Sequence, residues 1–133
     1  CSVHPLGAMR YHPVAAASLL DRARDADGEV DWRRVPMVRF DEDDALQHDW
    51  LAARGRPTPD VLHRVPTTAD LFAAIRCGLG WGMLLDHQLA DRSASDLVRL
   101  ADDPVLVPLH WQRWRVDSPT LTRLTEAVLA AAT

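Results

Sequence analysis

Short apolar runs alternate with longer segments of helical period through the middle of the chain. The apolar runs cover residues 37–40, 62–65 and 81–85, and helical spacing marks residues 43–54 and 68–79. Two neighbouring parallel strands must be joined by a crossover connection, which is usually a helix. The alternation therefore predicts an α/β domain, in which parallel strands are joined by helices that cover both faces of the sheet.

The N-terminal segment is predicted to contain one strand and one helix. Residues 6–11 alternate loosely between apolar and polar positions, as expected for a strand, and Pro13 suits the first turn of a helix. The apolar positions of that helix are Val14, Ala17 and Leu20. We expect the helix to end near Asp25, and a single helical turn to follow at residues 31–34.

The C-terminal third is predicted to be extended and then helical. A short helix is expected at residues 87–92, followed by a strand at 97–100 and an extended run at 105–115. Ser118 is a good N-cap residue and Pro119 suits the first helical position, so the last helix is expected to begin there.

Composition and charge limit the classes of protein that fit. The 133 residues are 47% hydrophobic and carry a formal net charge of −4, which fits one globular domain and not a basic nucleic-acid-binding body. The most apolar stretch, residues 77–85, is far shorter than the roughly 20 residues of a membrane-spanning helix. Cys1 and Cys77 have no metal-binding spacing, which favours a reducing, cytoplasmic location. Since the chain starts at Cys1 without a signal-peptide pattern, we expect a processed chain or a fragment.

Two strand-to-helix junctions carry the candidate binding residues. Asp41 and Asp44 belong to an acidic cluster where a strand ends, a position at which carboxylates suit a cationic ligand. Acids there can equally stabilise the positive end of a helix dipole, which is the favoured interpretation for Asp43. Thr67 and Thr68 open the next helix, where hydroxyls and free amides can hold a carboxylate or simply cap the helix.

Catalytic, metal and cofactor sites are not predicted. Asp44 and His48 share a helix face but lack a third ligand at suggestive spacing. The glycines at 78, 80 and 82 precede a strand, whereas those of a dinucleotide-binding motif follow one. Residues 110–115 mix aromatic and basic groups that could contact nucleic acid, but they fit a half-buried strand better. Cys77 is expected to be a small buried residue.

Three segments together resemble the LysR-type transcriptional regulators. The glycine-rich segment 77–85, the segment 38–47 and the pair Thr67 and Thr68 are similar to the branch containing the ArgP and LysG regulators of arginine and lysine export. In the glycine-rich segment, Gly78 or Gly80 can close a helix in the left-handed conformation, and Gly82 allows a close approach in the strand.

The resemblance implies an effector-binding domain with the type 2 periplasmic-binding-protein-like fold. Residues 1–11 would be a strand leaving the first subdomain, 12–104 the second subdomain, and 105–133 the return to the first with its C-terminal helix. The DNA-binding winged helix-turn-helix would lie outside this chain. The resemblance also implies a small-molecule effector, a basic amino acid, that would bind at Asp41, Asp44, Thr67 and Thr68. The protein would be a cytoplasmic homo-oligomer that controls an amino-acid exporter gene. One departure is Asp86, which replaces a proline common in the family and affects the hinge or cleft geometry.

Two other functions remain open from the sequence. An exported solute-binding lipoprotein of the same fold could carry its lipid on Cys1. A small α/β enzyme could use the acidic cluster at residues 41–44 with Mg²⁺. The regulator interpretation ranks first, because the incomplete first subdomain counts against a free-standing solute-binding protein, and the enzyme ranks last.

Overall fold

The computed structural model describes residues 1–132, and the chain divides into two compact units. Unit 1 comprises Cys1–Arg10 and Val105–Thr133, and unit 2 comprises Tyr11–Pro104. These boundaries fall close to those expected from the resemblance. The assignment of the two units to the two subdomains of the family stays a prediction.

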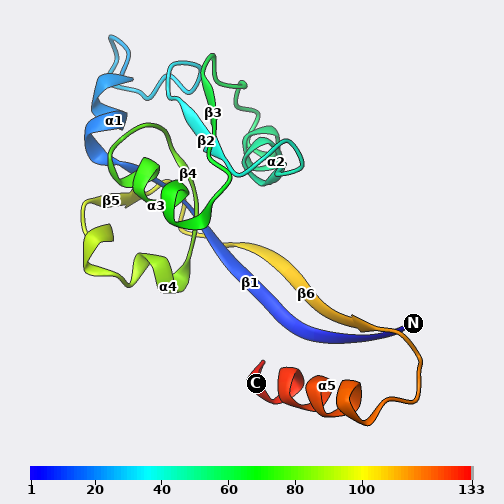
Figure 1. The fold of residues 1–133 in the computed structure, drawn as a ribbon. Helices are drawn as coiled ribbons and strands as arrows, with labels where there is room; N and C mark the ends of the chain where they lie inside the picture. The colour runs from blue at the N-terminus through cyan, green and yellow to red at the C-terminus, as the bar shows by residue number, and fades with distance from the viewer. Residues whose placement is uncertain (133) are drawn as a thin grey trace. The chain divides into compact units, whose positions relative to one another are not determined.

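Strand β1, Ser2–Ala16, contributes its first part to unit 1 and its last part to unit 2 (Figure 1). The other elements of unit 2 are α1 (Ala17–Arg22), β2 (Met37–Arg39), α2 (Leu46–Ala53), β3 (Leu62–Arg64), α3 (Thr68–Arg76), β4 (Gly82–Leu85), α4 (Asp86–Leu89), the 3₁₀ turn η1 (Arg92–Ala94) and β5 (Leu97–Arg99). Unit 1 adds β6 (Val105–Arg113), which pairs with β1, and α5 (Pro119–Ala131).

Unit 2 contains a sheet in the order β4, β1, β5 and a two-stranded sheet of β2 and β3, and a bridge beside β4 joins the two into one layer. Strands β2 and β3 are parallel, and a parallel bridge between Met37 and Trp81 joins β2 to the start of β4. Strand β1 runs antiparallel to both β4 and β5. The α/β class and the parallel β2–β3 pair are as predicted, whereas the antiparallel pairing of β1 is new. No crossover helix connects β1 directly to β4 or β5, so nothing requires them to be parallel.

Helices α2 and α3 cover opposite faces of this sheet. Successive residues of a strand point to opposite faces. The ring of Trp81 lies 5.2 Å from that of Trp50 on α2, whereas Gly82 lies against Ile75 on α3. A Cβ on Gly82 would be 2.8 Å from the Ile75 side chain, so the expected close approach is a packing contact between strand and helix.

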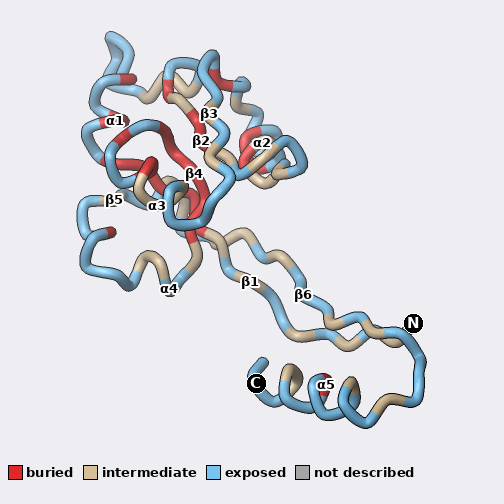
Figure 2. Tube along the Cα trace, in the orientation of Figure 1, coloured by how far each residue is buried: buried red, intermediate tan, exposed pale blue. Residues whose placement is uncertain are grey.

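The core of unit 2 contains an apolar cluster and a tryptophan cluster. Val14, Val38, Ala74, Ile75 and Leu84 form the apolar cluster between the sheet and α3. Trp32, Trp50 and Trp81 pack edge to face or tilted on the α2 side, with ring centroids 5.2–6.2 Å apart. The guanidinium of Arg56 lies 4.2 Å from the ring centroid of Trp32. Figure 2 shows the buried segments gathered on β4, β2 and the end of β1.

The helix after Pro13 was predicted to begin several residues before its actual start at Ala17. Val14, Ala15 and Ala16 are strand residues that pair with β5, and all three are buried. Val14 also pairs with Gly82 of β4, and this tertiary pairing outweighs the helical spacing. Helix α1 therefore starts at Ala17, and residues 31–34 form a hydrogen-bonded turn without a helix.

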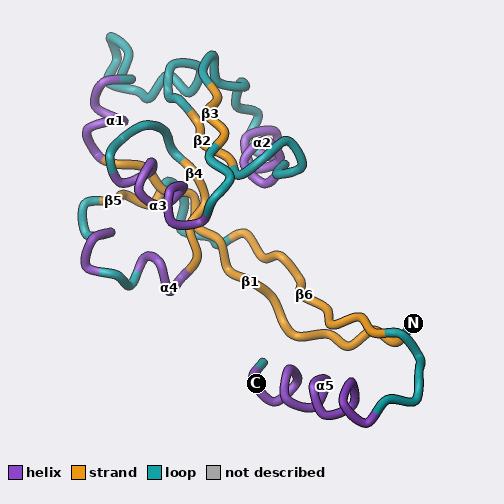
Figure 3. The backbone as a smooth tube through the Cα atoms, viewed as in Figure 1, coloured by secondary structure: helices purple, strands orange, loops and turns teal. Residues whose placement is uncertain are grey.

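Two other expectations in unit 2 also need correction. The segment 87–92 divides into α4 and the separate turn η1 (Figure 3). Cys77 is exposed, not buried, because it is the C-cap of α3. The chain leaves that helix through Gly78, whose φ of +82° confirms the predicted left-handed position.

Unit 1 combines the pairing of β1 with β6 and polar contacts between β6 and α5. The hydroxyl of Ser118 accepts a hydrogen bond from the Leu121 amide at 3.2 Å, which confirms the predicted N-cap. Trp111 and Arg113, on the same face of β6, donate to Thr125 Oγ1 at 3.0 and 3.3 Å. These contacts agree with the half-buried-strand interpretation up to Arg113, where β6 ends, whereas Trp114 lies beyond the strand and is exposed.

Candidate functional site

The two predicted junctions lie next to each other at one edge of the sheet. Asp41 and Asp44 follow β2, and Thr67 and Thr68 follow β3, its parallel neighbour. The Val65 amide donates to the Arg39 carbonyl at 2.9 Å and so continues the pairing to the strand ends. We call this edge, at the carboxyl ends of β2, β3 and β4, the C-terminal edge (Figure 1). The structure thus brings the four predicted residues together in one region.

Asp41 and Asp44 organise the loop that joins β2 to α2. Asp41 Oδ1 accepts from the amides of Asp43 and Asp44 at 2.9 and 3.1 Å. Asp44 accepts from the amides of Phe40 and Leu46 at 3.0 and 3.4 Å. Both side chains are half-buried, and their hydrogen bonds fix the carboxylates in position. A carboxylate has about four acceptor positions, so these bonds leave capacity for a cation.

Because of the same loop, α2 begins three residues later than predicted. The predicted helix began at Asp43, but side-chain bonds hold residues 41–45 outside the helix and α2 begins at Leu46. The dipole interpretation of Asp43 is therefore wrong, because Asp49 is the acid in the first turn. Glu42 forms an ion pair with Arg64 of β3 and links the two junctions.

Thr67 is the N-cap of α3. Its hydroxyl oxygen accepts from the Asp70 amide at 3.3 Å, and the hydroxyl donates to Asp70 Oδ2 at 2.7 Å. The capping interpretation is thus confirmed for Thr67, while the binding of a carboxylate stays a prediction. Thr68 is exposed in the first turn, where the amides of a helix start favour an anion.

Tyr11 extends the C-terminal edge to β1, and the sequence analysis did not identify it. Tyr11 is the antiparallel partner of Leu85, the last residue of β4. Burial and then the negative charge of Asp44 raise the pKa of the Tyr11 phenol above its usual 10.0. The acidic loop after β2 is therefore close enough to Tyr11 for their charges to interact across the end of β4.

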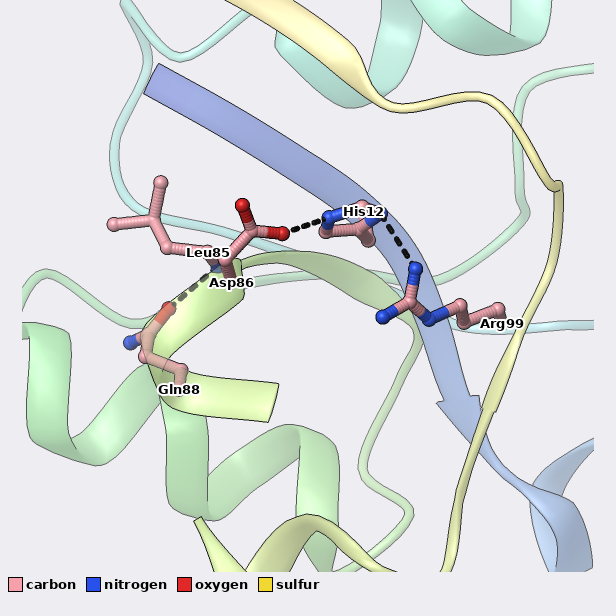
Figure 4. Close-up of polar contacts among 5 residues, drawn as sticks. All are labelled: His12, Leu85, Asp86, Gln88 and Arg99. Atoms are coloured by element: carbon pink, nitrogen blue, oxygen red, sulfur yellow. Dashed lines mark hydrogen bonds and ion pairs between the residues drawn. The ribbon is translucent and has the colours of Figure 1, made fainter. Parts of the chain in front are cut away.

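A buried histidine next to Tyr11 was also missed. His12 is 1% exposed, and its Nε2 forms a hydrogen bond with Asp86 Oδ1, while Nδ1 lies 3.2 Å from Arg99 Nη1 (Figure 4). The three residues come from β1, β4–α4 and β5 and are far apart in sequence. Asp86 was noted only as a replacement for proline, and no local pattern marks His12 or Arg99 as its partners.

The described residues contain neither a metal-binding cluster nor a membrane-spanning helix. Among residues 1–132 no group of three or more histidine, cysteine and acidic side chains is placed to hold a metal ion. No helix in that range combines the length and apolar character needed to cross a membrane. In unit 1, an open hollow of about 390 Å³ is lined by Cys1, Gln112, Arg113 and Trp114, none of which was predicted to bind an effector.

Comparison with known proteins gives a consistent result. No family model matches the sequence. LysG of Corynebacterium efficiens, a lysine export transcriptional regulatory protein, is 45% identical over 99% of this chain and 46% of its own length. Full-length LysG from Corynebacterium glutamicum, solved with bound effector Arg, has a TM-score of 0.86 and 40% identity, covering 99% of this chain and 46% of that one.

A third match lies in the C-terminal part of a regulator. The structure of the C-terminal domains of a LysR family protein from Agrobacterium tumefaciens has a TM-score of 0.85 and 33% identity, covering 99% of this chain and 66% of that one. The chain spans about half the length of the curated relatives it matches, which are named as transcriptional regulators and not as enzymes. It has the effector-domain fold and belongs to the LysR-type transcriptional regulators, in the branch that includes LysG and ArgP.

Proposed function

We propose that this chain is the effector-sensing part of a LysR-type regulator and that it binds a basic amino acid at the C-terminal edge. The observation that carries the proposal is the adjacency of two chemically opposite junctions on neighbouring parallel strands. The relationship to LysG, which was solved with bound Arg, supports the choice of ligand class.

The chemistry of the two junctions suits a zwitterion. Asp41 and Asp44 supply oriented negative charge for the α-ammonium group of the effector. Thr68 and the first amides of α3 supply donors for its α-carboxylate. Because the two groups share one carbon atom, they fit junctions on adjacent strands, which lie about 4.8 Å apart.

In this proposal the chain acts by binding and carries out no catalysis. The effector favours the conformation that it contacts best, and this population shift changes the geometry of a homo-oligomer. A winged helix-turn-helix outside this chain then reads DNA and controls an amino-acid exporter gene. The regulator would work in the cytoplasm, where it meets both DNA and free amino acids.

Thermal unfolding with L-arginine or L-lysine tests the proposal. A ligand at one hundred times its Kd stabilises the folded state by about 2.7 kcal/mol, so the melting temperature should rise clearly. Asp44→Asn and Asp41→Asn should remove most of the rise. Asparagine keeps an acceptor oxygen for the loop amides but loses the charge, so the loop hydrogen bonds can persist.

The single tyrosine offers a second measurement, because every tyrosinate signal comes from Tyr11. Asp44→Asn should lower the pKa of Tyr11 in an ultraviolet titration, since it removes a negative charge that favours the neutral phenol. Asp27→Asn, in the exposed turn after α1, is a matched control for the loss of one charge and should change neither measurement. The absence of any shift with either basic amino acid would contradict the proposal.

A further inference from the structure

Asp86 is the first residue of α4 and directly follows β4 at the C-terminal edge. Strand β4 ends at Leu85, and the Asp86 side chain is 54% exposed. The Leu85 amide donates to Gln88 Oε1 at 2.9 Å, which fixes the turn that presents Asp86. Leu85 is also the partner of Tyr11, whose phenol interacts with the charge of Asp44. Asp86 therefore lies in the same neighbourhood as the proposed effector site.

The buried His12 side chain orients the Asp86 carboxylate through a hydrogen bond. Arg99 can only donate hydrogen bonds, so the Nδ1 atom of His12 that it contacts at 3.2 Å must be the acceptor. The ring proton then resides on Nε2 and is donated to Asp86 Oδ1. The imidazole thus bridges the Asp86 carboxylate and the Arg99 guanidinium. Figure 4 shows Asp86 and Arg99 on opposite sides of the imidazole.

We propose that Asp86 binds the side-chain cation of the effector and that His12 is the residue that positions its carboxylate. The inference rests on the proposed function. With the α-ammonium and α-carboxylate groups at the ends of β2 and β3, a cationic side chain must extend beyond them. The end of β4 is two strand spacings from Thr68, about 10 Å, and it carries an oriented carboxylate.

Selectivity between L-arginine and L-citrulline tests the assignment directly. Citrulline has nearly the same shape as arginine, but its side chain is uncharged. Isothermal titration calorimetry on the full chain should show that Asp86→Asn weakens arginine binding about ten- to a hundredfold, the range expected for a lost hydrogen bond to a charged group. Citrulline binding should change less than about twofold, so the ratio of the two affinities should fall. Asp27→Asn controls for the change in net charge.

Two substitutions of His12 test its positioning role. His12→Leu removes the donor and should reduce the arginine-to-citrulline ratio as Asp86→Asn does. His12→Gln keeps an N–H donor near the position of Nε2 and should restore most of the ratio. A purely structural role would change stability without changing this ratio. If His12→Leu does not fold, Asp86→Asn and His12→Gln still decide the matter.

Failure of the Asp86 assignment and failure of the proposed function give different results. If the unmodified chain binds arginine and Asp86→Asn leaves the arginine-to-citrulline ratio unchanged, the assignment of Asp86 is overturned while the proposed function stands. If the unmodified chain binds no basic amino acid, the proposed function itself is overturned. A fall in the ratio that is specific to Asp86→Asn supports the assignment.

Discussion

The two units of this chain hold their structure in different ways. In unit 2, buried apolar side chains occur from Val14 to Ala94 and include the apolar cluster and two of the clustered tryptophans. In unit 1, Thr125 is the buried residue of the described segments, and Leu106, Leu124 and Trp114 are between 49% and 77% exposed. Unit 2 therefore depends mainly on apolar packing, whereas unit 1 depends on the pairing of β1 with β6 and on polar contacts to α5 such as those of Thr125.

The candidate binding loops of the C-terminal edge extend from the well-packed strands of unit 2. The loop of Asp41 and Asp44 and the turn of Asp86 extend from strands whose other residues are tightly packed. A packed strand fixes the point from which a loop starts, and side-chain hydrogen bonds then fix the loop itself. Unit 1 has no comparable packed base within residues 1–132.

Truncation in the core should give the largest effect and the clearest contrast between the units. Ile75 is fully buried in the apolar cluster, so Ile75→Ala should lower the free energy of unfolding by about 2–5 kcal/mol. Leu124, 49% exposed on α5, is the matched control, and Leu124→Ala should cost less than about 1 kcal/mol. Urea unfolding followed by circular dichroism measures both. Equal effects would show that α5 is packed as tightly as α3.

Adding a methyl group at Gly80 in unit 2 should lower the free energy of unfolding, by less than Ile75→Ala does. A Cβ on Gly80 would lie 3.0 Å from the Pro36 carbonyl oxygen and 3.1 Å from the Met37 carbonyl carbon, and this backbone cannot move aside freely. Gly80→Ala should therefore cost about 1–3 kcal/mol by overpacking. Gly82→Ala is a useful comparison, because its shortest contact, at 2.8 Å, is with the flexible end of Ile75. If Gly80→Ala proves the milder of the two, the backbone there is less rigid than we infer.

The smallest loss of stability is expected for a substitution in unit 1, and it should affect that unit alone. Thr125→Val keeps the side-chain volume but removes the hydroxyl that accepts from Trp111 and Arg113. Leaving these donors without their acceptor should cost about 1–2 kcal/mol. Hydrogen–deuterium exchange should show faster exchange in α5 and no change in β4. Faster exchange in both would mean that the two units unfold together.

Regular local patterns predicted much of the fold correctly. The alternation of apolar runs and helical periods located β2, β3, β4 and α3, and Ser118 with Pro119 marked the start of α5. The errors occur where distant segments meet. Val14 has helical spacing but lies between two strands, and Asp44 bonds to backbone amides before the helix begins.

The candidate site was predictable only in part. The positions of Asp41, Asp44, Thr67 and Thr68 follow from strand order, because parallel strands place their following loops at one edge. His12 is 74 residues from Asp86 and 87 residues from Arg99 in the sequence. No sequence motif therefore connects His12 with its two hydrogen-bond partners. Their arrangement depends on the antiparallel pairing of β1, which local periodicity did not reveal.

The tryptophans of the two units differ in their exposure to solvent, which affects the fluorescence of the chain. Three of its five indoles, Trp32, Trp50 and Trp81, lie within about 6 Å of one another in unit 2, whereas Trp111 and Trp114 belong to unit 1. Trp81 is fully buried and Trp114 is 77% exposed. The fluorescence of the chain is thus a mixture of shielded and water-exposed emitters, and quenching by a polar solute selects the second kind.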